Sequence, residues 1–546
     1  MPKFKKLLAL LLTVLLLSFS ACAKNETPAD NSTPTENSVV SQAEKDYQPT
    51  VKPDGSITLK PSQASDSSSS ATASEKENHI DENNDGKCDK CKESVLVYID
   101  LFAVNDLHGK FIDSSTQPGV DELSTYFKNA YKNEDNVVVL SSGDMWQGTA
   151  ESGLTNGKIM TEWMNYIGFE AMTVGNHEYD WGADDIEANI KIADFPLLAI
   201  NIYSRNDNER VDYYKSSVLI ERDGVKIGII GAVGDCYSSI SADMTSDIYF
   251  KTGKELTELV KNESIKLRAQ GAQIIIYSLH DGYDRSSSGK GMIADNQLEG
   301  YYDSVLSSGD YVDIVFEAHS HQNYVLKDAY GIYHMQGGGE NKGISHAEIA
   351  FNTVNENHIV TKAEYVQNSI YEVLEEDKIV DDLLDKYKTE LAITKKVLGK
   401  NGSHLESRDI CNLVARLYYE KGVQKWGSKY NIALGGGYLN TRSPYELPAG
   451  DVTYSMLYSL LTFDNQLVLC SIKGSDLKNK FLTNSKYYIY PNKSQSDFDS
   501  NKTYYVIVDS YTSTYRYNNL TEIERYDDNV YARDLLAEYI SAGNLK

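Results

Sequence analysis

Cysteine is scarce in this chain of 546 residues, and there is no excess of positive charge. Six cysteines are too few for a disulfide scaffold in a chain of this length. Lysine and arginine number 53 against 79 aspartates and glutamates, which gives a formal net charge of −26. Such an acidic chain excludes binding of a nucleic-acid polymer by general phosphate neutralisation, which needs clustered basic side chains. An anionic substrate stays open, because bound divalent cations can reverse the field inside an acidic protein.

Long apolar runs are also lacking, and the run at residues 7–17 is too short to cross a membrane comfortably. It follows three lysines and precedes small residues that end at Cys22, which is the layout of a secretory signal. The segment resembles the bacterial lipoprotein signal, in which the cysteine is acylated. We therefore expect residues 1–21 to be a lipoprotein signal peptide and Cys22 to be lipidated. The protein would then be exported and anchored at the outer face of the cell membrane, with plain secretion as the alternative.

Apolar residues are rare again between residues 23 and 78, where Ser, Thr, Asn, Glu and Pro dominate. Such a segment cannot bury enough apolar surface to fold, so we expect residues 22–93 to be a flexible tether. A short possible metal-binding motif at 79–91 lies at its end. Its candidate calcium ligands follow the start of an EF-hand loop: Asp81, Asn83, Asp85 and Asp89.

Two alternative interpretations of this motif stay open. The twelfth position of the loop is Lys92 rather than Glu, which excludes a complete EF-hand. Cys88 and Cys91, together with His79, could hold zinc instead, or the two thiols could oxidise outside the cell.

Short β-branched runs separated by helical or loop segments begin at residue 95. Several are continuously apolar, as expected of central strands that are covered on both faces. The runs are 95–104, 137–140, 171–174, 197–200, 225–233, 274–278 and 312–316. The segment 253–269 has helical spacing. We interpret residues 94–368 as one α/β domain.

A second domain follows a charged connector. Residues 369–397 have apolar positions at helical spacing amid dense charge, which predicts a mostly solvated connecting helix. Residues 398–546 are expected to form the second domain, with a helix at 409–419 and strands at 432–434, 466–472 and 504–508.

Five short polar motifs follow five of the apolar runs. Ligands of open α/β sheets gather at the carboxyl ends of strands, where all five motifs are expected to lie. The motifs are Asn105-Asp106-Leu107-His108-Gly109, Ser142-Gly143-Asp144, Gly175-Asn176-His177-Glu178-Tyr179-Asp180, Leu279-His280-Asp281 and Ala318-His319-Ser320-His321. Their oxygen and imidazole groups suit zinc, manganese, iron or nickel.

Each motif alone also fits a turn, a helix cap or a buried polar residue. Their number and regular order favour a metal site instead. A pair of metals about 3.5–4 Å apart is held economically by one bridging carboxylate, and Asp144 is the natural bridge.

The order Asp-x-His, Gly-Asp, Gly-Asn-His-Glu, His and His-x-His resembles the calcineurin-like metallophosphoesterase superfamily. With Gly435-Gly436-Gly437 and Arg442-Ser443-Pro444 further on, the chain resembles the bacterial 5′-nucleotidase, UDP-sugar hydrolase and 2′,3′-cyclic phosphodiesterase family over about residues 96–546. The resemblance implies a four-layered α/β/β/α metallophosphoesterase sandwich. A second α+β domain, the 5′-nucleotidase C-terminal substrate-binding domain, would follow it.

The resemblance also implies ligands for two divalent ions, zinc, manganese or similar. One ion would take Asp106, His108, Asp144 and His321, and the other would take Asp144, Asn176, His280 and His319. His177 and Asp180 match the family's catalytic pair, in which the charged imidazole assists attack by metal-activated water. A helix-start role for Asp180 is the alternative.

The second domain is expected to bind the nucleoside. Arg442 would pair with the substrate phosphate, and Phe463 and Tyr511 would sandwich the base. Asn465 matches a base-contacting position, and Gly436 and Gly437 belong to the family's glycine turn. A core role is the alternative for each of the two aromatic residues.

Three features depart from the family pattern. Two extra residues precede Arg442 after the glycine turn. His404 replaces a second expected arginine, unless Arg408 serves. The usual Gly-Gly-Asp-Gly is absent, and Tyr515-Arg516-Tyr517 stands in its place.

The sequence thus predicts an exported enzyme that hydrolyses nucleoside 5′-monophosphates or related small phosphate esters. A nucleotide-sugar pyrophosphatase or a 2′,3′-cyclic nucleotide phosphodiesterase is the alternative within enzymes. A surface nucleotide-binding lipoprotein without turnover is the alternative of another class.

Overall fold

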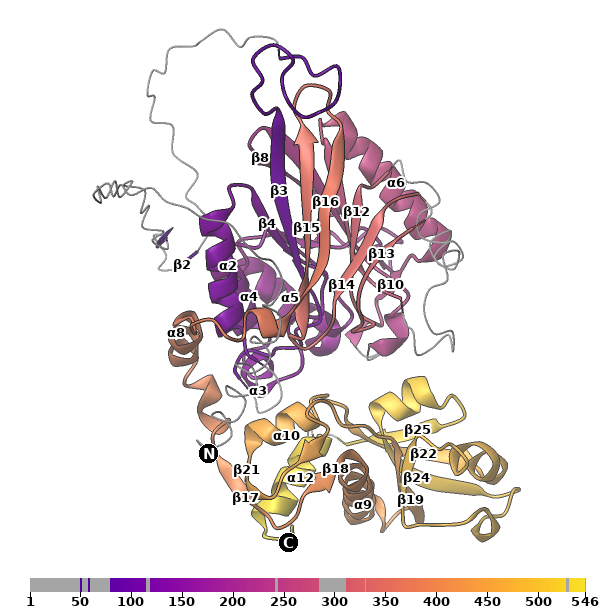
Figure 1. Ribbon diagram of the computed structural model, residues 1–546. Helices are drawn as coiled ribbons and strands as arrows, with labels where there is room; N and C mark the ends of the chain where they lie inside the picture. The colour runs from indigo at the N-terminus through magenta and orange to yellow at the C-terminus, as the bar shows by residue number, and fades with distance from the viewer. Residues whose placement is uncertain are drawn as a thin grey trace, which may run out of the picture. The chain divides into compact units, whose positions relative to one another are not determined.

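The computed structural model describes residues 50–51, 57–58, 79–113, 118–240, 244–283, 311–328, 330–526 and 530–545 (Figure 1). The expected signal peptide and Cys22 lie outside these residues, as does most of the expected tether. Within the tether, β1 (Thr50–Val51) and β2 (Ile57–Thr58) pair antiparallel. No helix in the described part of the chain has the length and apolarity that a membrane crossing needs.

Two six-stranded sheets form the centre of the first domain (Figure 1). In spatial order, the first sheet contains β16 (His358–Gln367), β15 (Gly343–Asn352), β3 (Leu96–Val104), β4 (Val137–Ser141), β5 (Ala171–Thr173) and β6 (Leu197–Leu198). The second contains β13 (Asn323–Lys327), β14 (Tyr333–Gly337), β12 (Ile314–Glu317), β11 (Ile274–His280), β9 (Val225–Val233) and β8 (Ser217–Arg222). A small antiparallel pair joins β7 (Ile202–Ser204) and β10 (Ile248–Phe250). Each of the seven predicted apolar runs contains or overlaps a strand.

The two sheets pack face to face. Ile99 and Leu101 of β3 share one buried cluster with Ile227 and Ile229 of β9 and Ile276 of β11. These strands read as continuous apolar runs because both of their faces are covered. The opposite face of the second sheet is covered by α6 (Gly253–Ala269), which has the predicted bounds.

Helices also cover the outer face of the first sheet. Phe102 of β3 lies edge-on to Phe127 of α2 (Asp121–Asn133), with ring centroids 5.9 Å apart. The indole of Trp163 in α4 (Lys158–Ile167) donates a hydrogen bond to the hydroxyl of Ser124 in α2. The domain is completed by α3 (Ala150–Gly153), η1 (His177–Trp181), α5 (Ala183–Ile192) and η2 (Tyr237–Ser239). The predicted α/β/β/α order of layers is therefore present.

The connector is not the single helix that the sequence predicts but a series of short helical segments. It contains η4 (Asn368–Ile370), α8 (Ile379–Lys386) and η5 (Glu390–Ile393). The carboxylate of Asp377 accepts the N–H of Ile379 and the hydroxyl of Tyr166, which fixes where α8 begins. Ile379 and Leu383 are buried, but most of the connector is exposed, as the sequence predicts.

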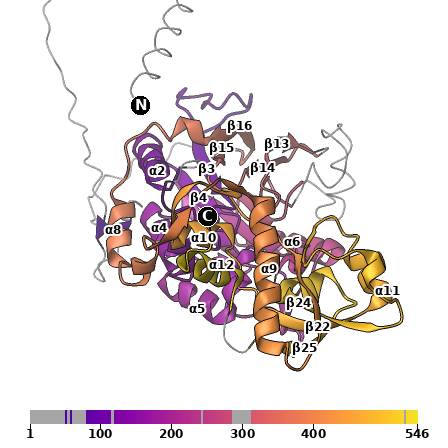
Figure 2. The ribbon, with the colours of Figure 1, turned by 90° about the horizontal axis from the view of Figure 1, so that it is seen from below.

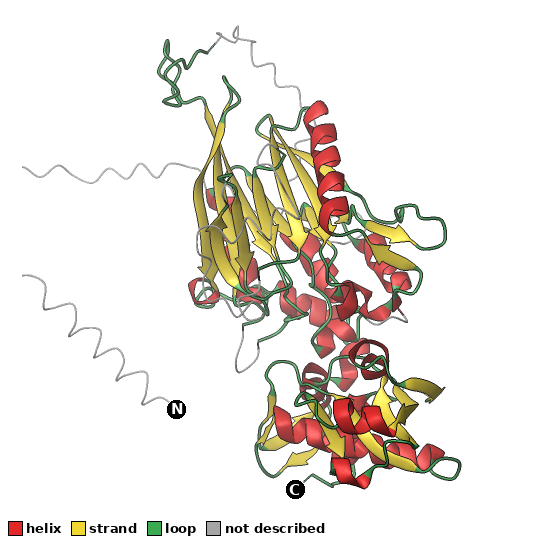
Figure 3. Cartoon of the chain, turned by 90° about the vertical axis from the view of Figure 1, so that its right-hand side faces the viewer, coloured by secondary structure: helices red, strands yellow, loops and turns green. Residues whose placement is uncertain are grey.

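The second domain is built on a five-stranded mixed sheet. Its spatial order is β23 (Tyr487–Tyr490), β19 (Ile432–Tyr438), β24 (Thr503–Asp509), β22 (Leu467–Lys473) and β25 (Thr521–Arg525). The long helix α9 (Ser407–Trp426) lies along this sheet (Figure 2) and packs mainly against β19 and β23. Two short pairs join β17 (Val397–Asn401) to β21 (Gly450–Thr453), and β18 (Leu405–Glu406) to β20 (Glu446–Leu447). The remaining elements are α10 (Tyr454–Leu460), α11 (Gly474–Asp476), η6 (Leu477–Phe481), η7 (Gln495–Asp497), η8 (Thr512–Arg516) and α12 (Ala532–Ser541), so this domain mixes helices with strands (Figure 3).

The last part of the expected tether is folded onto the first domain. The N–H of Val95 donates to the carbonyl of Gly86 at 3.0 Å, and Lys87 forms a β-bridge with Ser94. Asp81 is buried and accepts a hydrogen bond of 2.6 Å from the amide of Asn352. Residues 79–93 therefore do not behave as a linker, because their polar side chains are used in local and long-range hydrogen bonds.

Candidate metal centre and substrate cavity

The five polar motifs follow β3, β4, β5, β11 and β12, as the sequence predicts. The first three strands are parallel neighbours in one sheet, and β11 and β12 are parallel neighbours in the other. Their carboxyl ends meet at one edge of the sandwich, and the side chains of the motifs converge there.

Several candidate ligands have an uncommon backbone conformation. The φ angles of Asp106, His108, Asp144, His319 and His321 lie between 50° and 64°, in the left-handed region. Non-glycine residues rarely adopt this region, and such strain persists where the surrounding structure enforces it. The motifs are therefore held in place at a conformational cost.

One ligand group contains Asp106, His108 and His321, whose ligand atoms all lie within 4.8 Å of one another. Nε2 of His108 is 3.0 Å from Nε2 of His321, and Nε2 of His321 is 3.5 Å from Oδ1 of Asp106. Nδ1 of His108 lies 2.9 Å from the carbonyl oxygen of Gln147. A proton on Nδ1 satisfies that carbonyl and leaves Nε2 as a free ligand atom.

The second group contains Asp144, Asn176 and His280. Nε2 of His280 is 3.3 Å from Oδ2 of Asp144 and 3.1 Å from Oδ1 of Asn176. Nδ1 of His280 lies 2.8 Å from the carbonyl of Ser142, which orients the ring in the same way as His108. His319 joins this side of the cluster, where its ligand atom lies within 4.8 Å of that of His280.

These groups fit divalent cations. The side-chain nitrogen of Asn176 is buried without a hydrogen-bond partner, while its oxygen points into the cluster. Against the effect of burial, Asp144 raises the pKa of His280 to about 10, so this position attracts positive charge. Nitrogen and oxygen ligands around buried carboxylates are the donor set that zinc, manganese and iron accept.

The other ring groups are held neutral. Burial, followed by the charge of Arg442, lowers the pKa of His321 to about 3. Burial, followed by the charge of His280, lowers the pKa of His319 to about 4. A neutral imidazole is the form that binds a metal ion.

Glu178 supports the site without being one of the predicted residues. Its carboxylate accepts backbone N–H groups from Gly175 at 2.7 Å, Asp144 at 2.9 Å and Met145 at 2.8 Å. It thus joins the loops after β4 and β5. The signal available in the sequence was its place in the Gly-Asn-His-Glu motif.

Gly175 allows those two loops to approach closely. A Cβ atom at this position would lie 2.3 Å from Oδ1 of Asp144 and 2.7 Å from Cε1 of His280. Only glycine fits between these two side chains without displacing one of them.

His177 and Asp180 form a buried pair. Nδ1 of His177 is 2.7 Å from Oδ2 of Asp180. Burial opposes the charge on His177, but Asp180 and then Asp144 outweigh it and raise the pKa of His177. The two side chains proposed from the sequence as a catalytic pair are thus in contact.

A cavity of about 430 Å³ connects this centre to the second domain. Residues of both domains line it, including Asp144, His177, Asp180, His319, His321, Arg442, Phe463, Asn465, Tyr511 and Arg516. The ring of Phe463 stacks on the ring of His177 with centroids 5.5 Å apart, and the guanidinium of Arg442 lies 5.6 Å from the centroid of Phe463.

Two predicted substrate-binding residues are not on the cavity wall. Gly436 and Gly437 have φ angles of 127° and 146° within β19. A Cβ atom on Gly436 would meet the carbonyl oxygen of Tyr488 at 1.9 Å, and one on Gly437 would meet the side chain of Thr512 at 2.7 Å. Close packing of β19 against Tyr488 and Thr512 therefore accounts for glycine at both positions.

Arg516 supplies a second arginine that sequence reasoning did not assign. Its guanidinium lies 4.5 Å from the ring centroid of Tyr438 and 4.9 Å from that of Tyr511, and it donates a hydrogen bond to the Tyr511 hydroxyl. His404 and Arg408 are not part of the cavity lining. The signal was the arginine in the segment that replaces the family's glycine-rich motif.

Cys236 is the other residue that was missed. The sequence favours a small buried hydrophobe here, and the side chain is indeed buried. Its sulfur, however, lies within 4.8 Å of the ligand atoms of His280 and His319. No local pattern marks this cysteine, because only the fold brings β9 next to β11.

The candidate calcium ligands in the 79–91 loop make hydrogen bonds within the loop. Asp81 accepts backbone N–H groups from Asp85 and Gly86 at 3.1 and 3.0 Å, and Asp89 accepts that of Glu82 at 2.8 Å. The amide of Asn83 donates to Asp85 at 3.0 Å. These carboxylates thus shape the loop.

Two family models match the chain. Calcineurin-like phosphoesterase matches residues 100–323, and the 5′-nucleotidase C-terminal domain matches residues 393–498. These matches fall on the two domains that the structure separates.

The chain is also similar to known proteins over most of its length. The protein UshA of Yersinia enterocolitica is 26% identical over 416 residues, which are 69% of this chain and 72% of that protein. An apyrase of Tabanus yao is 24% identical over 421 residues, 70% of this chain and 72% of the relative. The crystal structure of a 5′-nucleotidase precursor from Thermus thermophilus has the same fold, with a TM-score of 0.63, 18% identity and coverage of 82% of this chain and 97% of that one. Together with the metal-ligand cluster at the sheet edge, these matches show that the chain belongs to the family of metal-dependent phosphoester hydrolases that join a calcineurin-like phosphoesterase domain to a 5′-nucleotidase C-terminal domain.

Proposed function

We propose that this protein hydrolyses nucleoside 5′-monophosphates to nucleoside and phosphate. The observation that carries this proposal is the shared cavity. On one side it presents the polar cluster around Asp144 and His177, and on the other it presents Arg442, Phe463 and Tyr511. A phosphate near the first group would leave a base within reach of the aromatic rings.

Two divalent cations would be held by the residues that the sequence assigned. Asp106, His108, Asp144 and His321 would hold one ion, and Asp144, Asn176, His280 and His319 would hold the other. When bound, such cations lower the pKa of a water molecule and offset negative charge on phosphoryl oxygens.

The protein's own residues would orient and stabilise the substrate. His177, kept charged by Asp180, would place a hydrogen-bond donor beside the developing negative charge. Arg442 would bind the phosphate through its planar guanidinium. Phe463 and Tyr511 would stack on the base, and Asn465 would contact its edge.

A substrate panel tests this proposal. AMP, UDP-glucose and 2′,3′-cyclic AMP are each incubated with the protein and manganese, and released phosphate is measured with the coupling phosphatase needed for each product. Preference for AMP supports a nucleotidase. Preference for UDP-glucose or for the cyclic nucleotide would replace it with one of the two other hydrolases, and failure to hydrolyse any of the three would favour a binding protein.

We also propose export and lipid anchoring through Cys22, with a signal peptide at residues 1–21, a tether that ends before residue 79, a connector at 369–397, and the two domains at 94–368 and 398–546. A chain carrying Cys22→Ala should leave the membrane fraction, because two acyl chains on one cysteine give stable anchoring. If this variant stays membrane-bound, another segment anchors the protein.

A further inference from the structure

The loop at residues 79–95 lies at the opposite end of β3 from the candidate metal centre (Figure 1). Nine residues of strand separate the two ends, and a strand rises by about 3.3 Å per residue. Any ion bound in the loop is therefore separate from the cations near Asp106.

Backbone hydrogen bonds make this loop compact. The N–H of Asp89 donates to the carbonyl of Ile80 at 2.7 Å, which brings the start of the loop next to its end. The N–H of Lys92 donates to the carbonyl of Cys88 at 2.8 Å, which closes the turn between the two cysteines. His79 is thereby placed beside a Cys-x-x-Cys turn.

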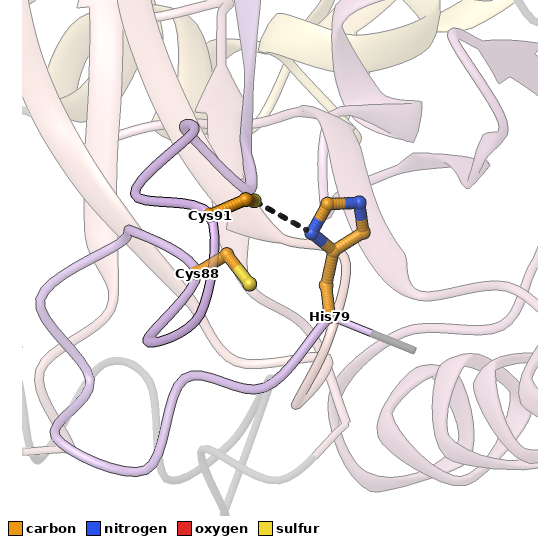
Figure 4. Close-up of side chains that lie close together, drawn as sticks. All are labelled: His79, Cys88 and Cys91. Carbon is orange, nitrogen blue, oxygen red and sulfur yellow. Dashed lines mark hydrogen bonds between the residues drawn. The ribbon is translucent and has the colours of Figure 1, made fainter. Parts of the chain in front are cut away.

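The side chains of His79, Cys88 and Cys91 converge at this turn (Figure 4). Nδ1 of His79 is 3.5 Å from Sγ of Cys91, and the ligand atoms of His79, Cys88 and Cys91 all lie within 4.8 Å of one another. Zinc–sulfur and zinc–nitrogen bonds of about 2.3 and 2.0–2.1 Å at a tetrahedral angle give a nitrogen–sulfur distance of about 3.5 Å.

We propose that His79, Cys88 and Cys91 bind one zinc ion. The side chains of His79 and Cys91 are exposed, so a water molecule can take the fourth position. Thiolate and imidazole donors favour zinc over calcium, which takes oxygen ligands. The carboxylates of the same loop accept backbone N–H groups and thus hold the thiols in place.

The zinc ion would pin the chain to the end of the first sheet. Asp81 and Asn84 hydrogen-bond to Asn352 and Asn355, which lie where β15 turns toward β16. A zinc ion that links residue 79 to residue 91 closes the loop over this turn. Residues 79–91 would then form a zinc-bound loop that holds the chain against the first sheet just before β3 begins.

Cobalt substitution and zinc analysis of the purified protein test this proposal. Cobalt should give the thiolate-to-cobalt charge-transfer band, and the zinc-loaded protein should lose one zinc per chain in both His79→Ala and Cys91→Ser. Lys90→Ala, an exposed change between the two cysteines, is the matched control and should keep both signals. Asp144→Ala should keep the cobalt band, because the site formed by His79, Cys88 and Cys91 is distinct from the catalytic centre.

Three results would overturn the proposal. The first is an unchanged zinc count in Cys91→Ser. The second is an intact mass lower by two hydrogens, which would mean that Cys88 and Cys91 form a disulfide. The third is a loop that binds calcium, loses it in Asp85→Asn and does not bind zinc. Because His79 and Cys91 are exposed, far-ultraviolet circular dichroism should be unchanged in their variants, so loss of zinc would not reflect unfolding.

Discussion

Oδ2 of Asp144 lies 3.9 Å from Nε2 of His108 and 3.3 Å from Nε2 of His280, between the two ligand groups. Asp144→Ala removes the carboxylate that both groups share. We expect hydrolysis to fall below detection and bound metal to drop from two ions toward one or none. Metal analysis on the same samples as the assay checks both parts. Two retained ions would mean that another residue bridges them.

His177 differs from the ligands because its Nδ1 is already paired with Asp180. His177→Asn should therefore keep both metal ions while turnover falls by about a hundredfold, the effect of losing one proton donor. Metal analysis and kcat are measured together. Loss of metal in this variant would make His177 a ligand.

Gly175 tests the geometry around Asp144 without changing any ligand. In Gly175→Ala the new methyl group meets Oδ1 of Asp144 and the ring of His280, so one of them must move. We expect metal affinity to fall by about 10- to 100-fold, as when a supporting residue of a metal site is lost. Metal affinity equal to that of the parent protein would contradict the role assigned to Gly175.

At the scale of elements, His334 of β14 ties its strand to β12. Its Nδ1 is 2.9 Å from Glu317, and its Nε2 is 3.4 Å from Asp328. Against the effect of burial, Glu317 raises the pKa of His334 from 6.5 to about 9. A pKa that is higher in the folded state stabilises the fold below pH 6.5, and this stability fades as the pH rises through 9.

The stability difference between the parent protein and His334→Gln should therefore be largest below pH 6.5 and shrink by on the order of 3 kcal/mol by pH 9. Urea unfolding at several pH values measures it. A pH-independent difference for His334→Gln would mean that its ion pairs do not contribute to stability.

Local patterns predicted most strands and α6, because the apolar runs at 225–233 and 253–269 express the packing of the element itself. The connector was predicted poorly, since Asp377 and contacts with α4 decide where α8 begins. The metal-ligand motifs were visible because each occupies a few consecutive positions. Cys236 and Arg516 were not, because only tertiary structure brings them to the cluster and the cavity.

At the scale of the whole molecule, the proposed recognition of the base would depend on Phe463 and Tyr511, more than 140 positions after the last metal-ligand motif. Phe463→Ala removes one stacking ring, so the KM for AMP should rise about 5- to 100-fold. Initial rates over a range of AMP concentrations measure it. Hydrolysis of bis-p-nitrophenyl phosphate, which makes little contact with the second domain, should hardly change.

Equal losses on both substrates would point to a different role for Phe463. Its ring stacks on His177, so its removal would then act through the catalytic pair rather than the base. A matched variant, Tyr511→Ala, separates these outcomes, because the ring of Tyr511 lies against Tyr438 and Arg516 of the second domain.

The place of β3 in its sheet has a mechanical consequence. This strand is hydrogen-bonded to antiparallel β15 on one side and to parallel β4 on the other, and the chain reaches it directly from residue 79. A pull on the preceding segment along the strand axis loads both ladders in shear. Their hydrogen bonds must then rupture together rather than unzip one by one, and the lifetime under force is set by that unfolding barrier. A force applied from the N-terminal side of the catalytic domain would thus act on a central strand. A central strand resists such a force better than an edge strand, which can be peeled from its one neighbour.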